Sequence, residues 1–129
     1  MASLFTRIVQ GEIPCYKVAE DERFLAFLDI MPLTKGHVLV IPKTEVDYIF
    51  DLDDDLLGDM MIFAKKVALK MKRVLACRRI GLTVIGLEVP HAHIHLIPIN
   101  GVSDMDFSKP KLQPSKEELF EVASMITEA

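Results

Sequence analysis

Residues 91–97 read His-Ala-His-Ile-His-Leu-Ile, and they contain three of the four histidines in a chain of 129 residues. In a β-strand alternate side chains point to the same face, so the three imidazoles would form a row with a spacing of about 6.6 Å. The side chains of Ala92, Ile94 and Leu96 would point to the opposite face and pack against a helix. We therefore predict a strand over His91–Ile97, with chemistry on one face and core on the other.

The histidine row indicates a functional site, because every buried ring nitrogen needs a hydrogen-bond partner or water. One possible chemistry is metal binding, since imidazoles are good ligands for Zn²⁺ and Cu²⁺. Three residues that span about 13 Å of regular strand do not all reach one ion, so a metal would need further ligands from His37, Asp29 or Glu88. The other chemistry is nucleophilic catalysis by His93, the central residue, which has two titratable neighbours.

The rest of the chain alternates short apolar runs with helical patterns. Runs of β-forming residues broken by turns predict strands over Cys15–Ala19, Phe24–Asp29, His37–Ile41 and Leu82–Ile85. Capping patterns predict a short helix that follows Ser3 and a last helix that begins at Ser115. A 3.6-residue period predicts a long helix over Asp54–Cys77 whose buried stripe comprises Leu57, Met60, Met61, Ala64, Val67, Ala68, Met71, Val74 and Leu75.

This order of elements predicts an α+β fold with a mostly antiparallel sheet, because the hairpin connections are too short for parallel crossovers. The length suits one domain, and a net charge of −4 argues against a nucleic-acid-binding protein. No apolar stretch approaches the ~20 residues of a membrane span, and the N-terminus lacks the pattern of a signal peptide. Two widely spaced cysteines argue against a disulfide framework. We therefore expect a single-domain, cytoplasmic protein that binds neither nucleic acid nor membrane.

Two stretches resemble the histidine triad nucleotide-binding family. Residues 91–97 match its H-φ-H-φ-H-φ-φ signature, in which φ is an apolar residue. The block Phe24–Lys43, which reads Phe-Leu-Ala-Phe-Leu-Asp-Ile-Met-Pro-Leu-Thr-Lys-Gly-His-Val-Leu-Val-Ile-Pro-Lys, is similar to the first half of that family in residue type and spacing. The likeness covers about residues 4–99 of a single domain over 1–129. A C-terminal extension follows, with a helix over about 115–128.

The resemblance implies a five-stranded antiparallel sheet with one long helix and short terminal helices, paired as a homodimer. It also implies that His93 attacks the α-phosphorus of a nucleotide and forms a nucleotidyl-histidine, which water then hydrolyses. His95 would contact the phosphate and help to protonate the leaving group, while His91 and His37 would orient the site. Asp29 would hold the ribose hydroxyls, which suits a carboxylate that only accepts hydrogen bonds.

The resemblance further implies a nucleotide pocket around these groups. Its apolar base pocket would comprise Leu4, Phe5, Ile13, Phe27 and Ile30, each of which also suits plain core. Gly86 matches a glycine of the loop before the triad, but Leu87 stands where glutamine is usual and Glu88 where a hydroxyl residue is common. A carboxylate near a phosphate is repelled, so Glu88 either points away or acts on the leaving group. This departure bears on the leaving group and the rate more than on the fold.

Taken together, the resemblance and the histidine row predict a hydrolase or transferase that acts on an AMP-type purine nucleotide and uses no cofactor. The phosphoramidase-like branch of the family is preferred, with dinucleoside polyphosphate hydrolysis as an alternative. A second alternative is a nucleotide-binding regulator that has lost turnover with the loop residues before the triad. A third is a metal-dependent enzyme that uses the same histidines, and sensitivity to a chelator would identify it.

Overall fold

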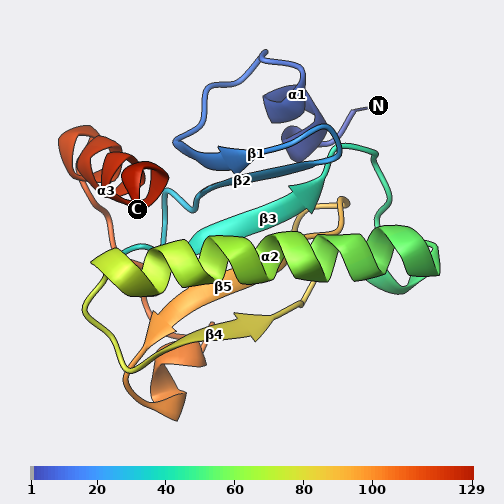
Figure 1. Ribbon diagram of the computed structural model, residues 1–129. Coiled ribbons are helices and arrows are strands. Elements are labelled where there is room, and N and C mark those ends of the chain that lie inside the picture. Colours follow the sequence, from blue (N-terminus) through green and yellow to red (C-terminus); the bar gives the residue numbers. More distant parts are fainter. Residues whose placement is uncertain (1) are drawn as a thin grey trace.

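The β-sheet has five strands, all antiparallel, in the order β1-β2-β3-β5-β4. The computed structural model describes residues 2–129. Its strands are β1 (Lys17–Glu20), β2 (Phe24–Leu28), β3 (Val38–Pro42), β4 (Arg79–Thr83) and β5 (Ile94–Ile99). Between β3 and β4 the chain crosses the sheet through α2 (Asp54–Val74), which lies along one face (Figure 1). The predicted α+β fold with an antiparallel sheet is confirmed.

The helices begin where side-chain caps satisfy their free backbone N–H groups. The Asp53 carboxylate accepts from the Leu56 N–H at 2.8 Å and starts α2. The hydroxyl of Ser3 caps α1 (Leu4–Val9), and that of Ser115 caps α3 (Lys116–Glu128). Two 3-10 helices lie in the connections, over Ile49–Asp51 and Val102–Met105. Among residues 2–129, none of the helices combines the length and apolar character that a membrane crossing requires.

The strands β2, β3 and β5 are buried on both faces of the sheet, and the elements that cover the two faces differ. One face packs against α2 and α3, whose core contacts include Met60, Phe63, Ala64, Val67, Met71, Leu119, Val122, Ala123 and Ile126. The other face packs against α1, where Phe5 joins Leu25, Phe27, Leu39 and Ile41. Alternate residues of β2 point to the two faces, so a five-residue strand is buried throughout. The histidines lie on the α1 face.

The buried stripe of α2 differs from the prediction at Met61, which is 45% exposed. Consecutive helical residues point about 100° apart, so the stripe through Met60, Ala64 and Met71 leaves Met61 outside it. Phe63 completes the stripe instead and packs against Phe24, with ring centroids 5.5 Å apart. The prediction of an amphipathic helix is correct, and its width was overestimated at this position.

The predicted end of α2 at Cys77 is wrong, because the helix stops at Val74. Leu75 adopts extended backbone with ψ 132° and is buried at the turn beside Gly36. Gly36 has a φ of +89°, and a Cβ there would lie 2.5 Å from Leu75 Cδ1. This turn therefore needs glycine for its backbone and for the space that Leu75 fills.

The last two predicted strands are also displaced. β4 begins at Arg79 instead of Leu82, because it is an edge strand whose exposed face tolerates charged residues. β5 begins at Ile94 instead of His91. The backbone N–H groups of His91 and Ala92 donate to carbonyls outside the sheet ladder, those of Val89 and Val46. The first two histidines of the row, His91 and His93, therefore precede the strand, and a regular 6.6 Å row is not formed.

The other boundaries lie close to those predicted. β1 starts two residues later than Cys15, and β2 and β3 differ from the predicted ranges by one residue at each changed end. The β2–β3 connection is closed by the Asp29 N–H, which donates to the His37 carbonyl at 3.0 Å. This hydrogen bond brings two predicted site residues to the same end of the sheet.

Candidate active site

His93 carries its proton on one ring nitrogen and keeps the other as a base. Its Nδ1 lies 2.7 Å from the carbonyl oxygen of His91. A carbonyl only accepts, so Nδ1 holds the proton and Nε2 of the neutral ring keeps its lone pair. The Phe5 ring stands edge-on against the imidazole, with centroids 5.0 Å apart. This is the tautomer that a nitrogen nucleophile requires.

His95 carries its proton on the other ring nitrogen, Nε2, whereas His93 carries its proton on Nδ1. The Leu33 N–H donates to His37 Nδ1 at 3.1 Å, so His37 carries its proton on Nε2. That Nε2–H donates to His95 Nδ1 at 3.0 Å, which leaves the His95 proton on Nε2. The ring centroids of His93 and His95 are 5.0 Å apart. A chain of hydrogen bonds that begins at the backbone thus ends in an N–H donor on the ring next to that of His93.

Burial keeps the supporting imidazoles neutral. Desolvation is the largest cause that lowers the pKa of His37 to about 3 and that of His95 to about 4. Neighbouring histidines and the Lys111 ammonium lower both pKa values further. Desolvation also lowers the pKa of His91, against the opposing effect of a carbonyl hydrogen bond. Near pH 7 these three rings are therefore uncharged.

His91 is fixed by a network that reaches the N-terminus. Its Nε2 donates to the Pro42 carbonyl at 2.7 Å, so its Nδ1 accepts from the Ser3 hydroxyl at 2.9 Å. Glu45 Oε1 accepts from the Ser3 N–H and the Thr6 hydroxyl, each at 2.6 Å. These hydrogen bonds, with that of Thr6 leading, lower the pKa of Glu45 to about 2. His91 is fully buried and acts on the site through its carbonyl, which orients His93.

A cavity of about 570 Å³ opens on the α1 face, within the usual size range of small-molecule sites. The predicted residues that line it are Leu4, Phe5, Ile13, Phe27, Asp29, Ile30, Glu88, His93 and His95. His37 and His91 stand behind the two cavity histidines. Gly86 is not brought to this cavity, since it lines a separate one with residues of α2 and of the 3-10 helix Ile49–Asp51.

Asp29 lines the cavity together with the histidines and the apolar residues. Its Oδ1 accepts from the Met31 N–H at 2.9 Å, and its Oδ2 stands 3.9 Å from His37 Nε2. Burial raises the pKa of Asp29, while the Met31 N–H and the charge of Lys111 lower it. Glu88 is exposed and lines the same cavity, so both carboxylates border the ligand space.

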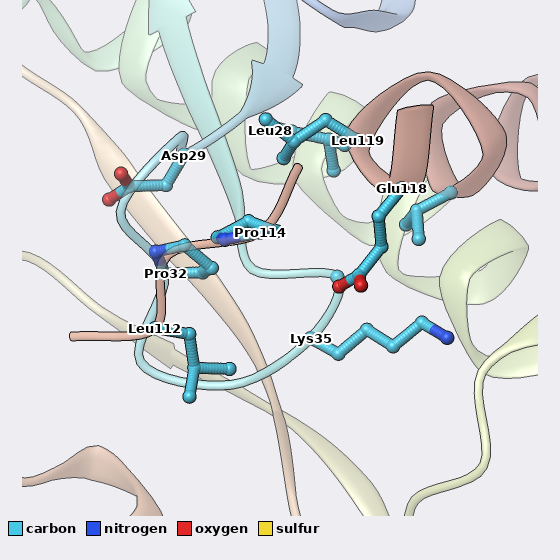
Figure 2. A pocket seen from close by; sticks show the side chains of 10 residues that line it. Leu28, Asp29, Pro32, Lys35, Leu112, Pro114, Glu118 and Leu119 are labelled. Atoms are coloured by element: carbon cyan, nitrogen blue, oxygen red, sulfur yellow. The ribbon is translucent and has the colours of Figure 1, made fainter. Parts of the chain in front are cut away.

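A second, much smaller cavity of about 10 Å³ lies behind Asp29 and has room for at most one water (Figure 2). Its other walls include Leu28, Pro32, Leu112 and side chains of α3. Figure 2 shows the Asp29 carboxylate pointing away from Glu118 of α3. The Leu112 N–H donates to the Pro32 carbonyl at 2.9 Å. This junction fastens the Asp29 loop to the C-terminal segment.

The sequence-based prediction missed Phe107 and Lys111. The Phe107 ring packs against His95 and His37, with centroids 4.9 and 6.3 Å apart. Lys111 lines the large cavity, and its Nζ donates to the Phe107 carbonyl at 2.7 Å. Both lie in an irregular segment without periodicity. A single phenylalanine within a polar run was the only local signal, and it did not indicate the histidines as its partners.

Asp29, His37 and His95 offer three possible metal ligands, whose atoms lie within 4.8 Å of one another. Ligation by His37 Nε2 needs the lone pair of that nitrogen, so the His37 proton would have to move to Nδ1. There it would face the Leu33 N–H, which already donates to Nδ1 at 3.1 Å. The hydrogen-bond polarity therefore favours a chain of N–H donors over a metal ion at these three residues.

Comparisons with known proteins find relatives in sequence and in structure. The adenosine 5′-monophosphoramidase hnt1 of Schizosaccharomyces pombe is 40% identical over 100 residues, which cover 76% of this chain and 74% of that protein. A solved HIT-like protein involved in cell-cycle regulation from Bartonella henselae has a TM-score of 0.85 at 29% identity, over 98% of this chain and 94% of that chain. A zinc-bound histidine triad family protein from Mycobacterium smegmatis has a TM-score of 0.84 at 27% identity, over 99% and 92% of the two chains.

The family model of the HIT domain matches residues 10–101. That range contains all five strands, α2 and the four histidines. With the geometry of the histidine row, this match shows that the chain belongs to the histidine triad, or HIT, family.

Proposed function

We propose that this protein hydrolyses nucleoside phosphoramidates and related AMP conjugates through a nucleotidyl-His93 intermediate. The observation that carries this proposal is that the His93 Nε2 lone pair and the His95 Nε2–H belong to neighbouring rings, with centroids 5.0 Å apart, that line one cavity. A nucleophile beside a hydrogen-bond donor suits displacement at phosphorus. The S. pombe relative, an adenosine 5′-monophosphoramidase, supports the same reaction class.

In the first step, His93 Nε2 bonds to the α-phosphorus while the P–N bond to the leaving amine breaks. The electron pair of that bond goes to the amine nitrogen, which takes the proton of His95 Nε2. His95 recovers a proton from a cavity water, and the hydroxide left in the solvent is neutralised by the proton that the second step releases. In the second step, water attacks the phosphorus and the P–Nε2 bond breaks, with its electrons returning to His93. The attacking water gives up one proton to solvent, so the net reaction consumes one water and yields AMP and the amine.

The rest of the cavity suits a nucleoside. Asp29 offers a carboxylate to ribose hydroxyls, and its contact with the Met31 N–H fixes its direction. The apolar wall, which includes Phe5 and Phe27, suits the face of a purine. These assignments place the base at the α1 side and the α-phosphate at His93.

The test is intact-mass analysis after rapid mixing of chelator-treated protein with an adenosine phosphoramidate. We expect a transient adduct of one AMP on the wild-type protein, and none on His93→Asn, which should still fold and bind AMP. Loss of the nucleophile should lower kcat by at least about 10⁴-fold. Full activity in His93→Asn would mean that the nucleophile is assigned wrongly.

Other results of this experiment would distinguish the alternative functions. AMP binding without adduct or product would favour a nucleotide-binding regulator. Activity that returns only with added Zn²⁺ would favour a metal-dependent enzyme. A dinucleoside polyphosphate tested in parallel measures the alternative hydrolase activity, for which the same nucleophile would release a nucleotide in place of an amine.

A homodimer belongs to the same proposal. β4 is an edge strand of the sheet, and Leu82 on it and Ile85 just after it are exposed. Exposed apolar side chains beside a free strand edge are typical of an interface. Light scattering of the wild-type protein and of Leu82→Glu tests this, with a monomeric wild type contradicting it.

A further inference from the structure

The wall of the cavity beside His95 is built by the segment that follows β5. The Phe107 ring stands 4.9 Å from the His95 ring, and the Lys111 ammonium lies 5.6 Å from the centre of the Phe107 ring. We propose that Lys111 forms a subsite for a negatively charged group on the leaving portion of the substrate. This inference rests on the proposed function and names the substrate class more narrowly: AMP conjugates whose leaving group is anionic.

The first support is the charge of the cavity lining. Among the described residues that line it, Lys111 is the only lysine or arginine, and Asp29 and Glu88 contribute two carboxylates. Without Lys111, an anionic ligand would meet two carboxylates and no lysine or arginine among these residues. The ammonium is therefore the group that makes the cavity tolerate a second negative charge besides the α-phosphate.

The second support is position. In the proposed reaction the leaving group departs beside His95, whose N–H gives it a proton. Lys111 is close enough to lower the pKa values of His95, His37 and Asp29 by its charge. Because the base would lie at the apolar wall, the Lys111 ammonium would lie near the leaving group, which is the part of the substrate that differs between AMP conjugates.

The third support is that the charge is held in place. The Lys111 Nζ donates to the Phe107 carbonyl at 2.7 Å, with a longer contact of 3.5 Å to the Lys109 carbonyl. The neighbouring Leu112 N–H fastens the segment to Pro32 in the Asp29 loop. An ammonium has three N–H donors, so a held lysine still has a donor to offer a carboxylate or phosphate of the leaving group.

The experiment compares two adenosine 5′-phosphoramidates of nearly equal size, one made with β-alanine and one with β-alaninamide. Their leaving amines differ in a carboxylate against a neutral amide. We expect the wild-type protein to favour the carboxylate in kcat/KM by about tenfold, the size of one partly exposed charged contact. Lys111→Met should abolish this preference, Lys111→Arg should retain it, and added salt should weaken it.

Lys109→Met is the matched control, because it removes the same charge from the same turn at an exposed position outside the cavity. It should keep the wild-type preference. If Lys111→Met lowers kcat/KM equally for both substrates, the lysine only stabilises the turn and the subsite is overturned. A wild-type protein without preference between the two substrates also overturns it.

A binding measurement separates this proposal from the proposed function. Calorimetry with His93→Asn and with His93→Asn combined with Lys111→Met measures affinity for both phosphoramidates without turnover. A carboxylate preference in the first variant that is absent from the second supports the subsite even if the wild-type protein hydrolyses neither compound. Equal preferences in the two variants contradict it.

Discussion

The two faces of the sheet are closed to different degrees, and this difference separates stability from chemistry. One face is covered by α2, with 21 residues, and by α3, with 13, and its core is apolar throughout. The other is covered by α1, with six residues, and it retains a large cavity and four histidines. The histidines are held by directed hydrogen bonds, whereas the core on the α2 face is held by packing. We therefore expect substitutions on the two faces to affect different measurements.

The largest loss of stability is expected on the α2 face. Met60→Ala should lower the free energy of unfolding by about 2–5 kcal/mol, because Met60 is fully buried in the core. The neighbouring Met61→Ala is the control and should change it by less than about 0.5 kcal/mol, since Met61 is exposed. Urea unfolding measures both. An altered KM in a folded Met60→Ala protein would break the separation between the faces.

The pH dependence of stability tests the sheet face that carries the histidines. The folded-state pKa values of about 3 for His37 and about 4 for His95 lie below the reference value of 6.5, so the unfolded chain binds more protons between these limits. The contribution of these two histidines to the free energy of unfolding is therefore fully present above pH 6.5. It falls as the pH drops towards 4, by about 1.4 kcal/mol for each pKa unit of the shift, which amounts to a few kcal/mol. The raised pKa of Asp29 opposes part of this loss.

Urea unfolding at pH 7, 6, 5 and 4 measures the acid effect. His37→Gln should flatten the profile, because it removes the group with the lowest histidine pKa in the chain of N–H donors. A wild-type stability that stays constant from pH 7 to 4 would show that the histidines are not buried as described.

A smaller effect is expected at Asp29. Asp29→Asn should weaken AMP binding by about 1–3 kcal/mol, because an amide makes weaker hydrogen bonds to ribose hydroxyls than a carboxylate does. Calorimetry with 2′,3′-dideoxy-AMP provides the control, since this ligand should bind the wild type and the variant alike. Unchanged affinity for AMP would remove Asp29 from the ribose.

The smallest effect is expected at Ser3. Ser3→Ala removes the donor to His91 Nδ1 and should lower kcat by about fivefold, or about 1 kcal/mol, with KM unchanged. Nitrogen chemical shifts of the imidazoles report whether the His91 tautomer changes, which a loss of helix capping alone would not cause. A matched removal of an exposed hydroxyl, Ser108→Ala, should leave kcat unaltered. A change in KM alone would place Ser3 in ligand binding.

Local patterns were enough to predict the elements that local interactions form. The Asp53 cap sets the start of α2, and period-2 alternation placed Ile94 and Leu96 in the core opposite the site. The end of α2 was mispredicted because it depends on Leu75 meeting Gly36, which lies 39 positions earlier in the chain. Such contacts between distant residues do not appear in a local period.

The site, too, was predictable from the sequence only where local patterns determine it. Alternation and the family resemblance predicted His93, His95 and Asp29 as site residues, and all three line the same cavity. The histidine tautomers could not be predicted from the sequence, because they depend on distant backbone and hydroxyl groups; the tautomer of His91, for example, depends on the Pro42 carbonyl and Ser3. Gly86 follows the family spacing but lines another cavity, since spacing alone does not fix which way a loop turns.

The opposite polarity of the two cavity histidines has a consequence for inhibitor chemistry. In the proposed reaction, a ligand that replaces the reacting phosphorus would have to offer a donor to His93 Nε2 and an acceptor to His95 Nε2–H. A carboxylate supplies only acceptors and faces the lone pair of His93. An adenosine sulfamide supplies an N–H and a sulfonyl oxygen side by side, so an uncharged compound of this kind matches both rings and gives His93 no phosphorus to attack.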